Sequence, residues 1–329
     1  MGFSKELLYE VLETYKAEAL EHELAFSAKR RELYRKSPEL AELDSALRES
    51  AALLAQYVFG NSDAKSAAEI TNRAAGLRRE RDALLVRLGY PADALVYKYA
   101  CGKCQDTGFV SDAMCSCLEE KVRAAQSAQL SSMLDVSKTS FSTFRLDYYS
   151  DEISEEFSVS PRENMEINVD ICKEFVSTFA LSAQNLLLNG APGLGKTFLS
   201  GAIAREISAA GHSVVYDSAI HIFTTFEIER FKQGDKVTSE KYVDCDLLIL
   251  DDLGCEATTG FTTAALYNII NLRLLKGRST IINTNLAVHE IKQRYSPQIY
   301  SRVNGEYTLL YFFGEDIRKL RQHESHRIG

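Results

Sequence analysis

Residues 185–197 read NLLLNGAPGLGKT, an apolar run followed by a glycine-rich turn, a lysine and a threonine. Gly190, Gly195, Lys196 and Thr197 occupy the fixed positions of the pattern G-x-x-x-x-G-K-[ST]. The leucines before the turn predict a buried strand, and FLSGAIAREIS at 198–208 predicts a helix. A glycine-rich turn can match this pattern by chance, but a strand before it and a helix after it favour a phosphate-binding loop.

The residue types in this loop suit phosphate binding. Glycine allows positive φ and close approach of the backbone to a ligand. The turned backbone then directs N–H groups toward an anion at the positive end of the following helix. Lys196 supplies a positive charge for the β- and γ-phosphates, and the hydroxyl of Thr197 suits Mg²⁺. The predicted ATP-binding residues are Gly190, Ala191, Pro192, Gly193, Leu194, Gly195, Lys196, Thr197, Phe198 and Asp251.

Acidic and amide side chains follow two later strand patterns. DLLILDD at 246–252 predicts a buried strand that ends in Asp251 and Asp252. Because ligands bind at the carboxyl ends of strands in open α/β sheets, we expect Asp251 to hold Mg²⁺ together with Thr197, and Asp252 to polarise the attacking water. An ordinary strand ending in acids is the alternative. STIINTN at 279–285 ends in a further candidate, Asn285, which is favoured over Asn283 because Asn283 could simply cap the strand.

Two arginines follow the third strand pattern. Arg302 lies in IYSRVNGE and Arg318 in GEDIRKL. Either residue alone is more often an ordinary surface arginine. A guanidinium can stabilise the negative charge that builds up during phosphoryl transfer, in the same subunit or in a neighbour. The predicted catalytic set is therefore Asp252, Asn285, Arg302 and Arg318.

The whole chain has the composition of a globular protein. It has 329 residues, an apolar share of 45% and a net charge of −8. No apolar run approaches the roughly 20 residues of a membrane span, so we expect no membrane partner and a cytoplasmic location. The acidic balance argues against coating duplex DNA by charge alone and points toward protein partners.

Residues 3–90 show helical apolar spacing, which predicts three helices with a break at Pro38. The basic cluster from Lys29 to Lys36 is either a partner surface or a solvated helix face balanced by nearby Glu. From about residue 164, strands alternate with helices, which predicts a parallel sheet covered on both faces. We therefore expect an α/β fold with an α-helical N-terminal domain. The expected parts are a partner-binding domain at 1–95, a zinc module at 96–120, a linker and entry segment at 121–163, and an ATPase domain at 164–329.

Four of the seven cysteines lie close together. Cys101 and Cys104 form C-x₂-C, and Cys115 and Cys117 form C-x-C. Two pairs of thiolates predict a closed, structural Zn²⁺ site, since no ligand position is left open for catalysis. A redox pair and unrelated free thiols are the alternatives.

The motifs GAPGLGKT, LLILDDLG, TIINTNL, IYSRVNG and FFGEDIR occur in the order in which the bacterial DnaC/DnaI-type replicative helicase loaders and the related IstB transposition ATPases carry them. The resemblance covers residues 135–329 and implies an AAA+ P-loop fold that binds ATP and Mg²⁺. It implies that Asp252 takes the place of the catalytic base, Asn285 that of the first sensor, Arg302 that of the arginine finger and Arg318 that of the second sensor. Phe141–Tyr149 resembles the segment near the adenine.

The resemblance also implies partners. They are the replicative helicase, bound by the N-terminal domain, single-stranded DNA, and further copies of the chain in an ATP-dependent homo-oligomer. The chain departs from many AAA+ proteins in having Asp rather than Glu at Asp252, which suggests slow hydrolysis, and in ending soon after Arg318, which leaves no room for a helical lid. The expected function is ATP-dependent loading of the replicative helicase. An IstB-like transposition helper and a nucleotide-gated adaptor with little hydrolysis are the alternatives.

Overall fold

The computed structural model describes residue 3 and residues 5–59, 64–133, 139–231 and 239–320. The chain divides into two compact units. One, here called the helical unit, comprises Leu12–Leu118; the other, the sheet unit, comprises Met1–Val11 and Glu119–Gly329. The finer predicted division at residues 95, 120 and 163 stays a prediction.

The three predicted N-terminal helices are present. They are α1 (Lys5–Lys36), α2 (Pro38–Phe59) and α3 (Ala64–Arg87). Pro38 opens α2 because its ring cannot continue α1 but suits the first turn of a helix. α2 packs along α3, and a small core forms around Leu33, Leu40, Leu85 and Leu95. Lys36 at the end of α1 forms an exposed ion pair with Glu32 at 2.7 Å, as expected for a solvated helix face.

After these helices the helical unit contains a short hairpin, β1 (Phe109–Val110) and β2 (Ala113–Met114). The remaining elements are α4 (Ser116–Met133), two 3₁₀ turns η2 (Phe141–Thr143) and η3 (Leu146–Tyr148), α5 (Pro161–Thr178), β3 (Leu186–Gly190), α6 (Lys196–Ala209), β4 (Val214–Ser218), α7 (Ala219–Phe231), α8 (Glu240–Asp244), β5 (Leu247–Leu253), α9 (Gly260–Leu275), β6 (Ser279–Thr284), α10 (Val288–Arg294), α11 (Pro297–Glu306) and β7 (Thr308–Phe312).

The sheet has five strands in the order β4-β5-β6-β3-β7, and all of its pairings are parallel. This confirms the predicted α/β fold class. β6 lies between β3, which leads into the phosphate loop, and β5, which carries the acidic pair. The fifth strand, β7, was not predicted. From Leu310 to Phe312 its sequence TLLYF alternates buried and exposed residues, and Thr308 at its start is exposed, because the strand lies at an edge of the sheet rather than inside it.

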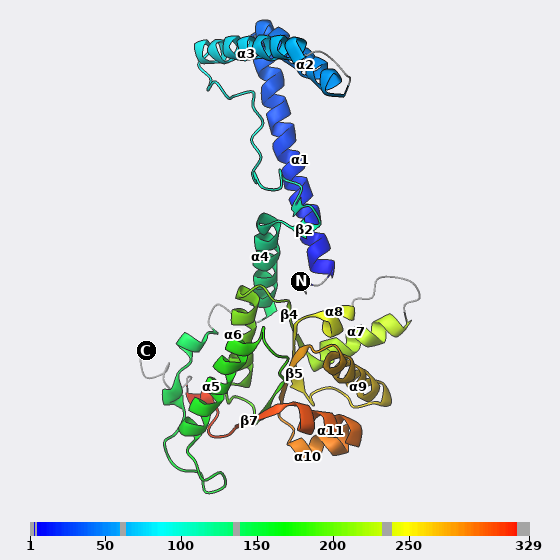
Figure 1. Ribbon diagram of the computed structural model, residues 1–329. Helices are drawn as coiled ribbons and strands as arrows, with labels where there is room; N and C mark the ends of the chain where they lie inside the picture. The colour runs from blue at the N-terminus through cyan, green and yellow to red at the C-terminus, as the bar shows by residue number, and fades with distance from the viewer. Residues whose placement is uncertain (1–2, 4, 60–63, 134–138, 232–238, 321–329) are drawn as a thin grey trace. The chain divides into compact units, whose positions relative to one another are not determined.

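Two apolar cores cover the faces of the sheet. Figure 1 shows α5 and α6 on one side and α7, α9 and α11 on the other. Met165, Phe175, Leu199 and Ile203 are buried on the first side. Leu266, Ile269, Ile299 and Val303 are among the residues buried on the second. A parallel sheet covered in this way leaves its carboxyl edge as the place where polar side chains can gather.

Side-chain amides cap the two edge strands. On β4, Gln126 of α4 accepts a hydrogen bond from the N–H of Val214 at 3.2 Å and donates to the carbonyl of His212 at 2.7 Å. On β7, Asn164 and Asn168 of α5 both donate to the carbonyl of Tyr311 at 2.7 Å. These bonds satisfy backbone groups that an open edge would leave unpaired.

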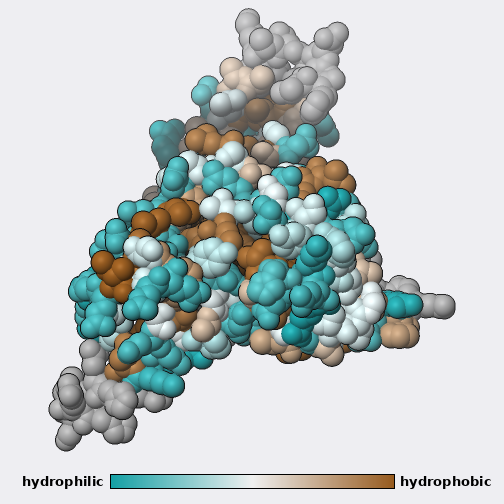
Figure 2. Space-filling view, turned by 90° about the horizontal axis from the view of Figure 1, so that it is seen from below, coloured by the Kyte–Doolittle hydropathy of each residue, from teal (hydrophilic) through white to brown (hydrophobic). Residues whose placement is uncertain are grey.

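None of the helices in the described part of the chain combines the length and the apolar character that a membrane span requires. In the face of the sheet unit drawn in Figure 2, hydrophilic residues cover most of the surface, and hydrophobic residues form separate groups among them.

Replacing Gln126 by Ala is expected to loosen the β4 edge. The N–H of Val214, the carbonyl of His212 and the hydroxyl of Ser208 would each lose their hydrogen bond to Gln126, at a cost of about 1–3 kcal/mol. Amide hydrogen exchange should therefore accelerate at Val214. Glu120→Ala, on the exposed side of the same helix, is the control. Equal protection of Val214 in both variants would show that Gln126 does not hold this edge.

Candidate functional site

The loop after β3 brings its backbone close to neighbouring segments. Gly193 and Gly195 have φ of +82° and +97°, in the region that favours glycine. A Cβ on Gly193 would lie 1.9 Å from Oδ1 of Asp316, and one on Gly195 would lie 2.6 Å from the hydroxyl of Tyr149. The loop therefore needs glycine at these positions for both backbone conformation and space.

Lys196 opens α6 and folds back over the loop. Its ammonium donates to the carbonyls of Gly190 and Ala191 at 2.6 and 2.8 Å and to Oδ1 of Asn285 at 2.7 Å. Burial lowers the pKa of Lys196 to about 8, although the charges of Asp252 and Asp251 oppose the shift. The structure thus joins the phosphate-loop lysine directly to the predicted first sensor.

Asp251, at the carboxyl end of β5, accepts hydrogen bonds from several elements. The hydroxyl of Thr197 lies 3.4 Å from its Oδ2, and the hydroxyl of Tyr216 donates to the same oxygen at 2.6 Å. Nδ2 of Asn283 donates to Oδ1 at 2.9 Å. Thr197 and Asp251 are therefore close enough to share one Mg²⁺, and their role as its ligands stays a prediction.

Asp252 has a φ of +54°, in the left-handed region that few residues with a side chain adopt. Burial, and next the charge of Asp251, raise the pKa of its carboxyl group above the usual value. Asp enters this region more readily than most residues. The short polar side chain of Asp252 therefore suits this backbone conformation.

The two arginines have different surroundings. Arg318 lies in the helical residues 317–320, and its charge acts on both Lys196 and Asp252. The neighbouring Ile317 N–H donates to the carbonyl of Gly193 at 3.1 Å. Arg302 on α11 instead lies over the ring of Tyr267, 5.3 Å from its centroid, and donates to its hydroxyl at 3.2 Å. The structure therefore brings Arg318 to the phosphate loop and sets Arg302 on α9.

The predicted entry segment also lies against the phosphate loop. The hydroxyl of Tyr149 donates to the carbonyl of Leu194 at 3.0 Å. Phe144 stacks on Tyr149 with ring centroids 5.8 Å apart, and meets Phe198 edge-on at 5.4 Å. These rings form an aromatic wall beside the start of α6.

Sequence reasoning missed Tyr216 and assigned Asn283 only a capping role. The sequence did not indicate a role for Tyr216 in the site, because an aromatic residue is common in a buried strand such as VVYDS. Asn283 did carry one, since a fully buried amide in an otherwise apolar strand requires a hydrogen-bond partner.

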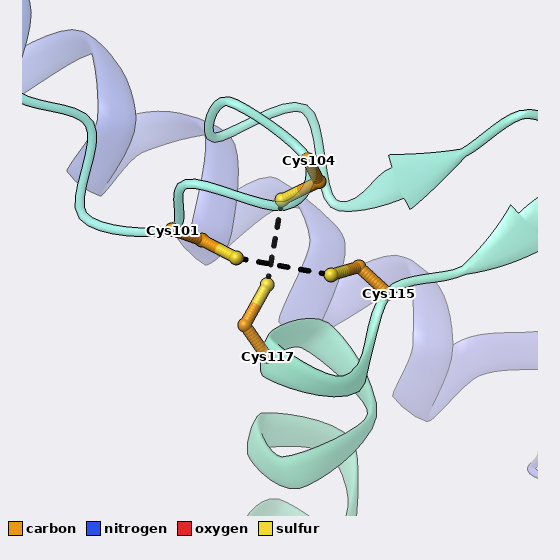
Figure 3. A group of neighbouring side chains, drawn as sticks. All are labelled: Cys101, Cys104, Cys115 and Cys117. Carbon is orange, nitrogen blue, oxygen red and sulfur yellow. Dashed lines mark hydrogen bonds between the residues drawn. The ribbon is translucent and has the colours of Figure 1, made fainter.

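The four predicted metal ligands gather in the helical unit. Figure 3 shows the side chains of Cys101, Cys104, Cys115 and Cys117 pointing toward one another. Their sulfurs all lie within 4.8 Å of one another, with Cys101–Cys115 at 3.8 Å and Cys104–Cys117 at 3.5 Å. Four sulfurs bound tetrahedrally to zinc at about 2.3 Å would lie about 3.8 Å apart, so the cluster fits this metal.

Surrounding groups favour the thiolate form of Cys104 and the thiol form of Cys117. Burial opposes ionisation of Cys104, but hydrogen bonds involving Tyr15, the Gly108 backbone and neighbouring thiols lower its pKa to about 6. The pKa of Cys117 moves the other way, to about 12, first because of burial. The hydroxyl of Tyr15 lies 3.5 and 3.2 Å from these two sulfurs, and α1 therefore supplies a polar contact to the cluster.

Comparison with known proteins agrees with the geometry of the sheet unit. Residues 162–300 match the family described as IstB-like ATP binding protein. The chain is 24% identical over 152 residues to the replicative helicase loader DnaC of Buchnera aphidicola, covering 45% of this chain and 61% of that protein. It is 23% identical over 154 residues to DnaC of Escherichia coli K12, covering 45% and 62%. The chain thus spans about three-fifths of the length of these curated relatives.

Among solved structures, the crystal structure of the DnaC helicase loader matches with 20% identity and a TM-score of 0.43, covering 53% of this chain and 98% of that one. The resemblance noted from the motifs is confirmed: residues 162–300 match the family of IstB-like ATP binding proteins, and the two relatives described above are named as helicase loaders.

Replacing Cys104 by Ser is expected to abolish binding of zinc, since a closed site that loses one thiolate loses most of its affinity. Purified wild-type protein should carry one equivalent of zinc by elemental analysis, and the variant should carry none. Cys172→Ser is the matched control, because Cys172 is buried in the sheet unit outside the cluster. Equal zinc in all three proteins would rule out this site.

Proposed function

We propose that this chain is an ATP-dependent loader of the replicative DNA helicase. The observation that carries the proposal is the meeting of Lys196, Thr197, Asp251 and Asn285 at one edge of the sheet. A lysine, a hydroxyl, a carboxylate and an amide in this arrangement suit the binding of a nucleotide with Mg²⁺. The loader reading is supported by the names of the curated relatives and by a four-cysteine cluster in the helical unit.

In the proposed mechanism Lys196 exchanges the carbonyls of Gly190 and Ala191 for the β- and γ-phosphates of ATP. The amides of the loop and the N-terminus of α6 hold the remaining phosphate oxygens. Thr197 and Asp251 would hold Mg²⁺, which would neutralise charge on the phosphates. Asp252 polarises the attacking water, and Asn285, released from Lys196, orients it near the γ-phosphate.

Arg318 acts within the subunit, because its charge already reaches Lys196 and Asp252. Arg302 acts on the nucleotide of a neighbouring subunit in an ATP-dependent homo-oligomer. Its contact with Tyr267 supports this role, because it holds the guanidinium on α9 rather than at the phosphate loop of its own chain.

The helical unit is proposed to bind the helicase, with Zn²⁺ as a structural ion that stabilises the cysteine module. The sheet unit is proposed to contact single-stranded DNA during delivery. An IstB-like transposition helper uses the same ATPase core, and the family match at residues 162–300 favours it equally. The cysteine cluster outside that match favours the loader.

Mixing the purified protein with the replicative helicase of its source organism tests this function. Size-exclusion chromatography with light scattering should detect a complex, and ATP should change its stability or its transfer to single-stranded DNA. The Lys196→Ala variant should still bind the helicase, but ATP should no longer affect the complex, because the variant lacks the positive charge that pairs with the β- and γ-phosphates. Failure to bind helicase, together with an ATP-dependent filament on DNA, would favour the transposition helper. ATP binding without turnover would favour the adaptor.

The trans role of Arg302 can be tested by mixing two inactive variants. Arg302→Ala should bind ATP normally but lose most turnover, because removal of an arginine finger costs about 10³-fold or more. Lys196→Ala should neither bind nor hydrolyse ATP. A mixture should recover activity, since Arg302 of the Lys196→Ala subunit can serve the intact site of its neighbour. Absence of recovery, or normal turnover by Arg302→Ala alone, would contradict the trans role.

A further inference from the structure

The carboxylate of Asp251 accepts hydrogen bonds from residues outside the nucleotide-binding motifs as well as from within them. A carboxylate offers about four lone-pair positions for hydrogen bonds or metal ions. On Oδ1, Nδ2 of Asn283 donates at 2.9 Å and the N–H of Asp252 at 3.0 Å. On Oδ2, the hydroxyl of Tyr216 donates at 2.6 Å. Three of the four positions are thus filled by short hydrogen bonds.

The fourth position faces the phosphate loop. Its contact is the hydroxyl of Thr197, at a longer 3.4 Å. Thr197 is also the residue whose hydroxyl is expected to bind Mg²⁺. The arrangement therefore leaves one lone pair of Asp251 weakly engaged, on the side where the metal or its water would lie.

The donor groups are buried and cannot easily turn away. Tyr216 is 5% exposed and Asn283 is fully buried. A tyrosine hydroxyl is protonated near neutral pH, so Tyr216 acts as the donor to the carboxylate. The other hydrogen of Nδ2 in Asn283 goes to Oγ of Ser200 at 2.8 Å. Turning the amide over would place its oxygen against the carboxylate and lose the hydrogen bond to Asp251.

The two side chains reach Asp251 from the strands on either side of β5. Tyr216 comes from β4 and Asn283 from β6. Both lie away from the phosphate loop in the sequence. Tyr216 also interacts with the side chain of Thr197 and lies 3.4 Å from the hydroxyl of Ser200, but its shortest bond, at 2.6 Å, is to Asp251. The orientation and charge of Asp251 are therefore the main route by which the two residues can act on the site.

We propose that Tyr216 and Asn283 are positioning residues that hold Asp251 with one lone pair directed toward Thr197, and so set the affinity of the nucleotide site for Mg²⁺. The inference rests on the proposed function, since it assumes that this site binds ATP with Mg²⁺. Groups that hydrogen-bond a metal ligand typically change metal affinity or activity by about 10- to 100-fold when removed. Without the Tyr216 hydroxyl, Oδ2 of Asp251 loses its short hydrogen bond, which helps to orient the carboxylate and to stabilise its charge.

The test is the binding of a fluorescent ATP analogue to the full chain at increasing free Mg²⁺. Tyr216→Phe keeps the ring in the core and removes only the hydroxyl. Asn283→Leu keeps a similar volume and removes both donors. Tyr242→Phe is the matched control, because Tyr242 also donates to a carboxylate, Asp217, at 2.8 Å, but belongs to the core on the other face of the sheet. Thermal unfolding confirms that each variant is folded.

We expect Tyr216→Phe to raise the Mg²⁺ midpoint about 10-fold, in line with the loss of other groups that orient metal ligands, and to leave nucleotide affinity in EDTA unchanged. Asn283→Leu should move the midpoint in the same direction, and Tyr242→Phe should not move it. An unchanged midpoint in Tyr216→Phe, or an equal shift in Tyr242→Phe, would overturn the inference. If the wild type shows no Mg²⁺-dependent nucleotide binding, the proposed function itself fails.

Discussion

A buried positive charge organises the carboxyl edge of the sheet. The ammonium of Lys196 is removed from most of the solvent, and an isolated charge in this position would be costly. Two carbonyls of the phosphate loop and the amide of Asn285 satisfy it. The loop can turn its carbonyls toward the lysine only because glycines permit its backbone conformation. Phosphate oxygens can accept the same hydrogen bonds from Lys196. A bound nucleotide could therefore replace the carbonyl and amide oxygens that the ammonium contacts in this structure.

The order of the strands places the other charges around this lysine. With β6 between β3 and β5, Asn283 on β6 reaches Asp251, while Asn285, directly after the end of β6, reaches Lys196. One strand thus contacts both the cationic and the anionic part of the site. Asp252 departs into the left-handed region next to this pair, and backbone strain of this kind is common at functional sites.

The cysteine cluster provides a way to stabilise a segment that has almost no hydrophobic core. The segment around β1 and β2 is short and has little apolar surface to bury, so hydrophobic packing alone contributes little stability. Four converging thiols supply a place for a metal to hold this segment, and Tyr15 links the cluster to the long helix α1. The helical unit and the sheet unit are thus stabilised by different means, the first by a small core and a metal-binding cluster, the second by two apolar layers around a sheet.

The amino-acid sequence alone determined the features that depend on neighbouring residues. Apolar runs predicted β3, β4, β5 and β6, Pro38 predicted the break between α1 and α2, and the cysteine spacing predicted the cluster, because strand burial, helix breaking and paired ligands are local properties. The alternating pattern of β7 was too weak to be recognised, since an edge strand is only half buried. Tyr216 could not be assigned to the site, because its hydroxyl reaches Asp251 only after β4 and β5 pair. Likewise the contact of Lys196 with Asn285 and the placement of Arg302 on Tyr267 were decided by the tertiary structure, since strand order and helix packing join residues that are distant in the chain.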